Sequence, residues 1–187
     1  MKTNYTNTTV TVNDILDENK FIVPTFQRNV VWKMNRRKEF IDTIRRGDPF
    51  GVILIQNNGG KYQLIDGLQR VTTIKDFCQK AFKYLSPNDI NEENVQKLVK
   101  RVFELHKLSL ENNTLDAQVE DYKKDIFEQL KAHSKTYQVI AAIRNKYGIP
   151  ADDEVDSNLD SICEKFKKDI DISQLQITAI NYIGPSE

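Results

Sequence analysis

Asp66, Gly67, Gln69 and Arg70 stand close together in the stretch IDGLQRVTTI, between an apolar run and a helical pattern. An arginine guanidinium is a fork of donors that suits phosphate oxygens, and a carboxylate can hold Mg²⁺ beside such a phosphate or orient a water molecule. Glycine tolerates a positive φ and lets a ligand approach the backbone. These residue types at a strand-to-helix corner indicate a phosphate site. The structural alternative is a corner in which Asp66 only caps the helix and Gly67 only makes the turn.

The helix after this corner adds a second source of anion affinity. Its apolar pattern predicts a start at Val71, which puts Thr72 and Thr73 in the first turn. N–H groups in a first turn have no acceptor within the helix, and the helix dipole is positive there. We therefore expect the backbone near Thr72 and Thr73 to complete an anion cradle with Arg70.

A second corner, VPTFQRNVVW (residues 23–32), also places a Gln-Arg pair after an extended apolar segment and just before a helix. Arg28 would add a second cation there, next to the amide of Gln27. Phe26 and Trp32 could offer flat faces to a base. The alternative for both aromatic residues is core packing, which we favour for Trp32.

Other chemistries have less support. The sequence contains no G-x-x-x-x-G-K-[ST] or G-x-G-x-x-G loop and no zinc-ligand spacing. His106 and His133 are expected to be surface or hydrogen-bonded residues, and Cys78 and Cys163 to be reduced core residues. The four arginines of MNRRKEFIDTIRRG could contact a nucleic-acid backbone, although a solvated helix face explains them more simply.

The elements that must position these residues alternate in the first part of the chain. Apolar and β-branched patterns predict strands at 8–12, 21–24, 51–56 and 61–66 and helices at 14–19, 33–46 and 71–82, with Asn13 as an N-cap and NNGG as a four-residue hairpin turn. After Ser86-Pro87, four apolar stripes predict four helices, and residues 175–183 return to a strand. The chain is therefore expected to be an α+β protein whose second half is mostly helical.

Composition sets the remaining bounds. The chain has 187 residues, of which 39% are hydrophobic and 29% charged. It has no apolar stretch near the ~20 residues needed to cross a bilayer and no apolar leader, so we expect a cytoplasmic protein without membrane contact. Thirteen lysines and arginines against eight acids give residues 1–82 a charge of +5, and residues 83–187 carry −5. The basic half suggests an anionic ligand, although a solvated surface explains it equally well.

Both corners resemble signatures of a known family. VPTFQRNVVW is similar to P-x-[FY]-Q-R-x-[YV]-x-W, and IDGLQRVTTI is similar to D-G-Q-Q-R-L-T-T-[IL], with Leu68 where the family often has glutamine. These are the signatures of the N-terminal domain of GmrSD-type restriction proteins, which has a ParB/sulfiredoxin-like fold. The resemblance covers about residues 13–82. Family members usually continue into an F-E-R-I-N-x-x-G segment, so we expect this chain to be part of a longer protein.

The resemblance implies a ParB-like nucleotide-binding core at residues 1–82 and a helical region at 83–187 that ends in a strand. It implies that a nucleoside triphosphate, with Mg²⁺, is bound or hydrolysed to drive or regulate cleavage of foreign DNA in phage defence. When the family's roles are transferred to the matching positions, the catalytic residues are Asp66, Gln69 and Arg70. Asp66 is also the metal ligand. Gln27 and Arg28 belong to the second motif, which faces this site. DNA is then the expected partner of the full-length protein.

Three alternatives remain open. A DNA-binding module would use the +5 half without turnover, and its affinity for duplex DNA would fall steeply with salt. A nucleotide-sensing switch would bind without hydrolysis, so that only phosphate release distinguishes it from an NTPase. A scaffold would use both motifs structurally. A homodimer is also open, because an exposed terminal strand would accept a partner strand.

Overall fold

The computed structural model describes residues 3–24, 31–108 and 112–185. The chain divides into two compact units, the first made of Met1–Tyr84 with Asp171–Glu187 and the second of Leu85–Ile170. The first unit holds a sheet with helices, and the second unit is helical, which confirms the predicted α+β class. No helix in the described ranges has the length and apolar character needed to span a membrane.

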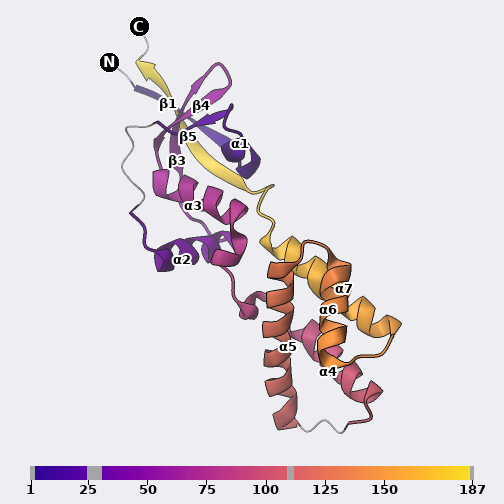
Figure 1. Cartoon of the computed structure of the whole chain (residues 1–187). Coiled ribbons are helices and arrows are strands. Elements are labelled where there is room, and N and C mark those ends of the chain that lie inside the picture. The colour runs from indigo at the N-terminus through magenta and orange to yellow at the C-terminus, as the bar shows by residue number, and fades with distance from the viewer. Residues whose placement is uncertain (1–2, 25–30, 109–111, 186–187) are drawn as a thin grey trace. The chain divides into compact units, whose positions relative to one another are not determined.

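The first unit contains a five-stranded mixed sheet in the order β1-β5-β3-β4-β2 (Figure 1). Its elements are β1 (Thr3–Thr11), α1 (Val12–Leu16), β2 (Phe21–Ile22), α2 (Met34–Arg45), β3 (Ile53–Asn58), β4 (Lys61–Asp66), α3 (Leu68–Gln79), the 3₁₀ turn η1 (Ala81–Lys83) and β5 (Gln176–Pro185). Alternate residues of the strands are buried, among them Ile53, Ile55, Leu64, Ile177 and Ala179. Helix α3 contacts both α1 and α2, and its own buried stripe is Val71, Ile74 and Phe77.

Strand β5 lies inside this sheet although it comes last in the sequence. It pairs antiparallel with β1 and parallel with β3, where Ile53 faces Ala179. The expectation of an exposed terminal strand is therefore wrong, because both of its sides are paired. The outer strands of the described sheet are β1 and β2. The predicted division kept this strand with residues 83–187, whereas its backbone pairing places it in the first unit.

The hairpin of β3 and β4 is confirmed, but its turn is shorter than predicted. Asn58 pairs with Lys61, so the turn is the two residues Gly59 and Gly60. Both have positive φ, +62° and +88°. A two-residue turn of this kind matches the twist of the strands it joins, and two glycines adopt it without strain.

The first helix begins two residues earlier than predicted. Thr11, not Asn13, is the N-cap of α1: its hydroxyl accepts the N–H of Asp14 at 3.1 Å, and the Asp14 carboxylate accepts the N–H of Thr11 at 2.8 Å. This reciprocal capping box satisfies two donors that a helix end leaves open.

The second unit contains the four helices that the apolar stripes predict. They are α4 (Glu92–Leu105), α5 (Asn112–Ala132), α6 (Thr136–Tyr147) and α7 (Asp153–Ile170), preceded by the turn η2 (Pro87–Asp89). Helix α6 ends at Gly148, which has the left-handed conformation that glycine adopts without strain. Cys163 is buried as predicted, whereas Cys78 is exposed, so its assignment to the core is wrong.

Candidate functional site

Asp66 stands at the end of β4, where the sheet is irregular. The register shifts between Leu54, which faces Asp66, and Ile55, which faces Leu64, so β4 carries one extra residue before the corner. A bulge of this kind bends a strand and re-aims the side chains beside it. The Asp66 side chain is 77% exposed, and one carboxylate oxygen lies 3.9 Å from Nη2 of Arg70. The structure therefore leaves the acid open to solvent beside a cation.

Gly67 joins β4 to α3, and two structural features require glycine at this position. Its φ is +105°, and a Cβ added there would lie 2.8 Å from Cγ2 of Ile53 and 3.2 Å from its Cβ. Ile53 is 1% exposed and cannot move aside easily. The turn and the close approach to β3 both require the missing side chain, and neither involves a ligand.

Arg70 lies in the first turn of α3 and reaches back over the segment before β3. Its Nη2 donates to the carbonyl of Val52 at 2.8 Å. Within the described structure, its Nε is buried and has no hydrogen-bond partner. An unpaired buried donor is costly, more so on a charged group. An anion that reached this guanidinium would supply the acceptors that the protein leaves out.

Gln69 connects the two Gln-Arg segments. Its carboxamide oxygen accepts the N–H of Val31 at 2.9 Å and the N–H of Trp32 at 3.1 Å. The end of the first motif is thereby tied to the first turn of α3. In this arrangement the Gln69 oxygen positions backbone, a role that the sequence prediction of a catalytic glutamine did not include.

Replacing Gln69 by alanine is expected to cost about 1–2 kcal/mol of stability, because two N–H groups lose their acceptor. Gln69→Glu keeps an oxygen at the same reach and should cost less than half as much. Urea denaturation measures both. The matched control is Gln79→Ala at the exposed end of the same helix, which should change stability by less than about 0.5 kcal/mol. If Gln69→Ala and Gln79→Ala lower the free energy of unfolding equally, Gln69 does not position residues 31 and 32.

The predicted cradle at Thr72 and Thr73 is misplaced. Helix α3 begins at Leu68, because Gly67 already makes the turn, and the N–H of Val71 already donates to the carbonyl of Gly67. The Thr72 hydroxyl donates to the Leu68 carbonyl at 2.7 Å, and Thr73 is fully buried. The first-turn N–H groups therefore belong to residues 68–70, immediately beside Asp66.

A charged cluster that the sequence analysis missed joins α2 to α3. Arg37 donates to Asp76 at 2.9 Å and to the Thr73 hydroxyl at 3.3 Å, and Asp76 also accepts from Lys83 at 2.9 Å and Tyr84 at 2.6 Å. Burial opposes ionisation of Asp76, but the hydrogen bonds from Tyr84 and Lys83 and the charge of Arg37 outweigh it, so the pKa of Asp76 is lowered. Burial, and then the hydrogen bond to Asp76, raises the pKa of Tyr84. The cluster fixes the helix that carries Gln69 and Arg70.

The first motif is described only from Val31 onward. Phe26, Gln27 and Arg28 lie outside the described residues, so their predicted roles stay predictions. Trp32 is half-buried and packs edge-on against Phe40, with ring centres 5.3 Å apart, which agrees with the packing interpretation.

The four arginines of α2 and its end have intramolecular neighbours. Arg36 lies over the ring of Trp32 at 4.9 Å, Arg37 bonds to Asp76, Arg45 lies 3.8 Å from Asp42, and Arg46 bonds to Asp48 at 2.8 Å. The structure thus gives each of them a partner without nucleic acid.

A small cavity of about 240 Å³ opens on the segment that Arg70 contacts. It is lined by Pro49, Phe50, Gly51, Val52, Gln176 and Thr178. An added Cβ on Gly51 would lie 3.5 Å from Nη1 of Arg70, so the guanidinium and the cavity share this backbone. The lining offers an aromatic ring and two hydrogen-bonding side chains, but no charge.

Asp66 is the carboxylate that the corner offers to a metal ion. The described residues contain no cluster of three or more His, Cys, Asp and Glu side chains. Mg²⁺ is commonly held by one or two carboxylates together with substrate phosphates and water. Asp66 therefore fits a metal that arrives with a phosphate, and does not by itself form a complete metal site.

These features define an α+β domain with a D-G-x-Q-R motif at a strand-to-helix corner. Gln69 of this motif accepts hydrogen bonds from Val31 and Trp32, at the end of the other Gln-Arg segment. Residues 12–184 match the family model described as GmrSD restriction endonuclease, N-terminal domain. The chain belongs to this family, and it is therefore a protein of a restriction system. No curated protein matches it.

Proposed function

We propose that the first unit binds a nucleoside triphosphate at the Asp66–Arg70 corner and hydrolyses it. The observation that carries the proposal is the pair of hydrogen bonds from Val31 and Trp32 to Gln69, because it joins the two motifs. Only Asn29 and Val30 separate Arg28 from Val31 in the sequence. Arg28 would then supply a second cation beside Arg70, with Gln27 and Phe26 as further contacts to the nucleotide.

Three groups at the corner support a role in phosphoryl transfer. This reaction depends mainly on positioning and on neutralising phosphate charge, and asks little covalent chemistry of the protein. Arg70 offers an unpaired buried donor, the first turn of α3 offers backbone N–H groups, and Asp66 is open to solvent. Asp66 would hold Mg²⁺ or orient water, and Mg²⁺ when bound would neutralise phosphate charge. In this proposal Gln69 acts on the site by positioning residues 31 and 32.

Nucleotide binding is tested by thermal shift with ATP, GTP, CTP and UTP, each with Mg²⁺. A ligand at about 100 times its Kd adds roughly 2.7 kcal/mol, which corresponds to a rise in Tm of about 5–10 °C. We expect at least one nucleotide to produce this rise in wild type and Arg70→Ala to lose it. Arg46→Ala, which removes another arginine of the same unit, is the matched control and should keep it. If the folded wild type shows no rise with any of the four, nucleotide binding is excluded, and salt-sensitive duplex binding would then favour the DNA-binding alternative.

Turnover is tested separately by phosphate release. Asp66→Asn is expected to lower release by about 100-fold or more, the scale of losing one electrostatic catalytic contact, while a nucleotide-dependent rise in Tm persists. Asp48→Asn, which changes another exposed acid of the first unit, should leave the rate unchanged. A wild type that binds nucleotide and releases no phosphate would be a sensing switch instead.

A further inference from the structure

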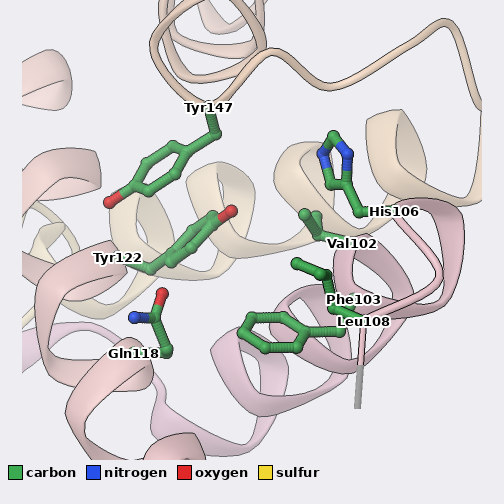
Figure 2. A pocket seen from close by; sticks show the side chains of 7 residues that line it. All are labelled: Val102, Phe103, His106, Leu108, Gln118, Tyr122 and Tyr147. Atoms are coloured by element: carbon green, nitrogen blue, oxygen red, sulfur yellow. The ribbon is translucent and has the colours of Figure 1, made fainter. Parts of the chain in front are cut away.

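The second unit contains a cavity of about 390 Å³ (Figure 2). Its lining comes from α4, α5, the segment after α4 and the end of α6: Val102, Phe103, His106, Leu108, Gln118, Tyr122 and Tyr147. Ligand cavities in proteins typically measure about 300–1,000 Å³. None of the lining residues belongs to either Gln-Arg motif, so the proposed nucleotide site does not account for this cavity.

One wall is a fixed pair of aromatic rings. Tyr122 and Tyr147 stack with ring centres 3.9 Å apart and an interplanar angle of 15°. The Tyr147 hydroxyl donates to Asp125, which also accepts from Lys146. Phe103 and Val102 add apolar surface. Such a wall favours flat, apolar surface on a ligand.

The polar groups of the cavity are few, and three of them make no hydrogen bond to another described residue. Tyr122 is 1% exposed, yet the hydrogen bonds among the described residues do not include its hydroxyl, nor the side chains of Gln118 and His106. Figure 2 shows the Tyr122 hydroxyl pointing toward Val102, whereas that of Tyr147 points away. Burial raises the pKa of Tyr122, so its hydroxyl stays a neutral donor. A hydroxyl that has no protein partner and lies at the edge of a cavity is free to bond to a group that enters it.

We propose that this cavity binds a neutral, flat heteroaromatic ring with hydrogen-bonding groups on its edge, of the nucleobase or indole class. Phe103 and Tyr147, which are only half-buried, contact the face of the ring. The Tyr122 hydroxyl and the Gln118 amide each offer a donor and an acceptor to its edge. A plain hydrocarbon would leave these groups unpaired. The lining contains no Asp, Glu, Lys or Arg, so it favours a neutral ligand over a charged one.

The test is a ligand-observed NMR titration of the whole chain with four probes: adenosine, indole, toluene, and a short single-stranded oligodeoxyadenylate. Adenosine or indole is expected to bind, and toluene to bind at least about fivefold more weakly, the factor for one lost hydrogen bond. Tyr122→Phe and Gln118→Leu should each weaken binding of the heterocycle by about fivefold or more. If the oligodeoxyadenylate binds more tightly than adenosine, the natural ligand is an unpaired base of a nucleic acid. If adenosine binds more tightly, the natural ligand is a free small molecule.

Two controls separate binding from folding and from the nucleotide site. Gln129→Leu changes another half-buried glutamine on α5 that lies outside the cavity lining, and it should leave affinity unchanged. Tyr122→Phe should keep the Tm of the free chain, because the hydroxyl has no protein partner to lose. Arg70→Ala should not affect adenosine binding. The proposal is overturned if neither heterocycle binds the folded chain, if toluene binds as tightly, or if Tyr122→Phe and Gln118→Leu bind like wild type.

Discussion

Replacing Gly67 by alanine is expected to lower the free energy of unfolding by about 3–4 kcal/mol. A left-handed φ costs a residue with a Cβ roughly 1–2 kcal/mol, and overpacking a tight core site costs roughly 1–3 kcal/mol. Both apply here, because φ is +105° and the new Cβ would lie 2.8 Å from Cγ2 of Ile53. Urea denaturation of the purified chain gives the difference.

Gly47→Ala separates the two contributions. Gly47 follows α2, its φ is +76°, and a Cβ there meets nothing within 4 Å. Alanine at this position should therefore cost only the conformational part, about 1 kcal/mol. If both substitutions cost the same, the collision with Ile53 contributes nothing, and close packing of the corner on β3 is not what requires glycine.

Replacing Asp76 by alanine is expected to cost about 2–4 kcal/mol, toward the lower part of the range for breaking a buried ion pair because some solvent reaches the site. The side chains of Asp76 and Arg37 are only 18% and 14% exposed, so Arg37 would lose its acid where water replaces it poorly. Tyr84 and Lys83 lose the same acceptor. Asp48→Ala breaks the exposed pair with Arg46 and should cost less than about 0.5 kcal/mol.

Asp76 should also contribute to loss of stability in acid. Its pKa is lowered in the folded chain, so the unfolded chain takes up a proton first as the pH falls. The stabilisation is therefore complete at pH values above the ordinary aspartate pKa of about 4 and is lost below it. The difference in stability between wild type and Asp76→Asn should shrink from pH 7 to pH 3. A constant difference would show that the charge of Asp76 does not contribute.

Features that depend on local periodicity were predictable from the sequence. The buried stripe of Val71, Ile74 and Phe77 and those of the four later helices follow from spacing alone, and the β3–β4 hairpin follows from two apolar runs around glycines. The position of β5 between β1 and β3 was not predictable, because a strand's partners are set by pairing across the whole chain.

The candidate site divides in the same way. Asp66, Gly67 and Arg70 were found because they are neighbours in sequence at a strand-to-helix corner. The contact of Gln69 with Val31 joins residues 38 positions apart, and that of Arg37 with Asp76 joins residues 39 apart. Spacing of three between Thr73 and Asp76 indicates a shared face of α3, which was the only local sign of the cluster. The helix start was misread because its N-cap is Gly67, which has no side chain to make a capping hydrogen bond.

The interior position of β5 has a consequence for synthesis of the protein. Residues 1–84 leave the ribosome with β3 lacking one neighbour, and that neighbour, β5, begins only after about 90 further residues. At roughly 5–20 residues per second, the gap lasts about 5–20 s. Over that interval the backbone of Ile53–Ile55 cannot pair with β5, so this edge of β3 must be prevented from pairing with other strands. The helices encoded between β3 and β5 can fold first, because their contacts are near in sequence.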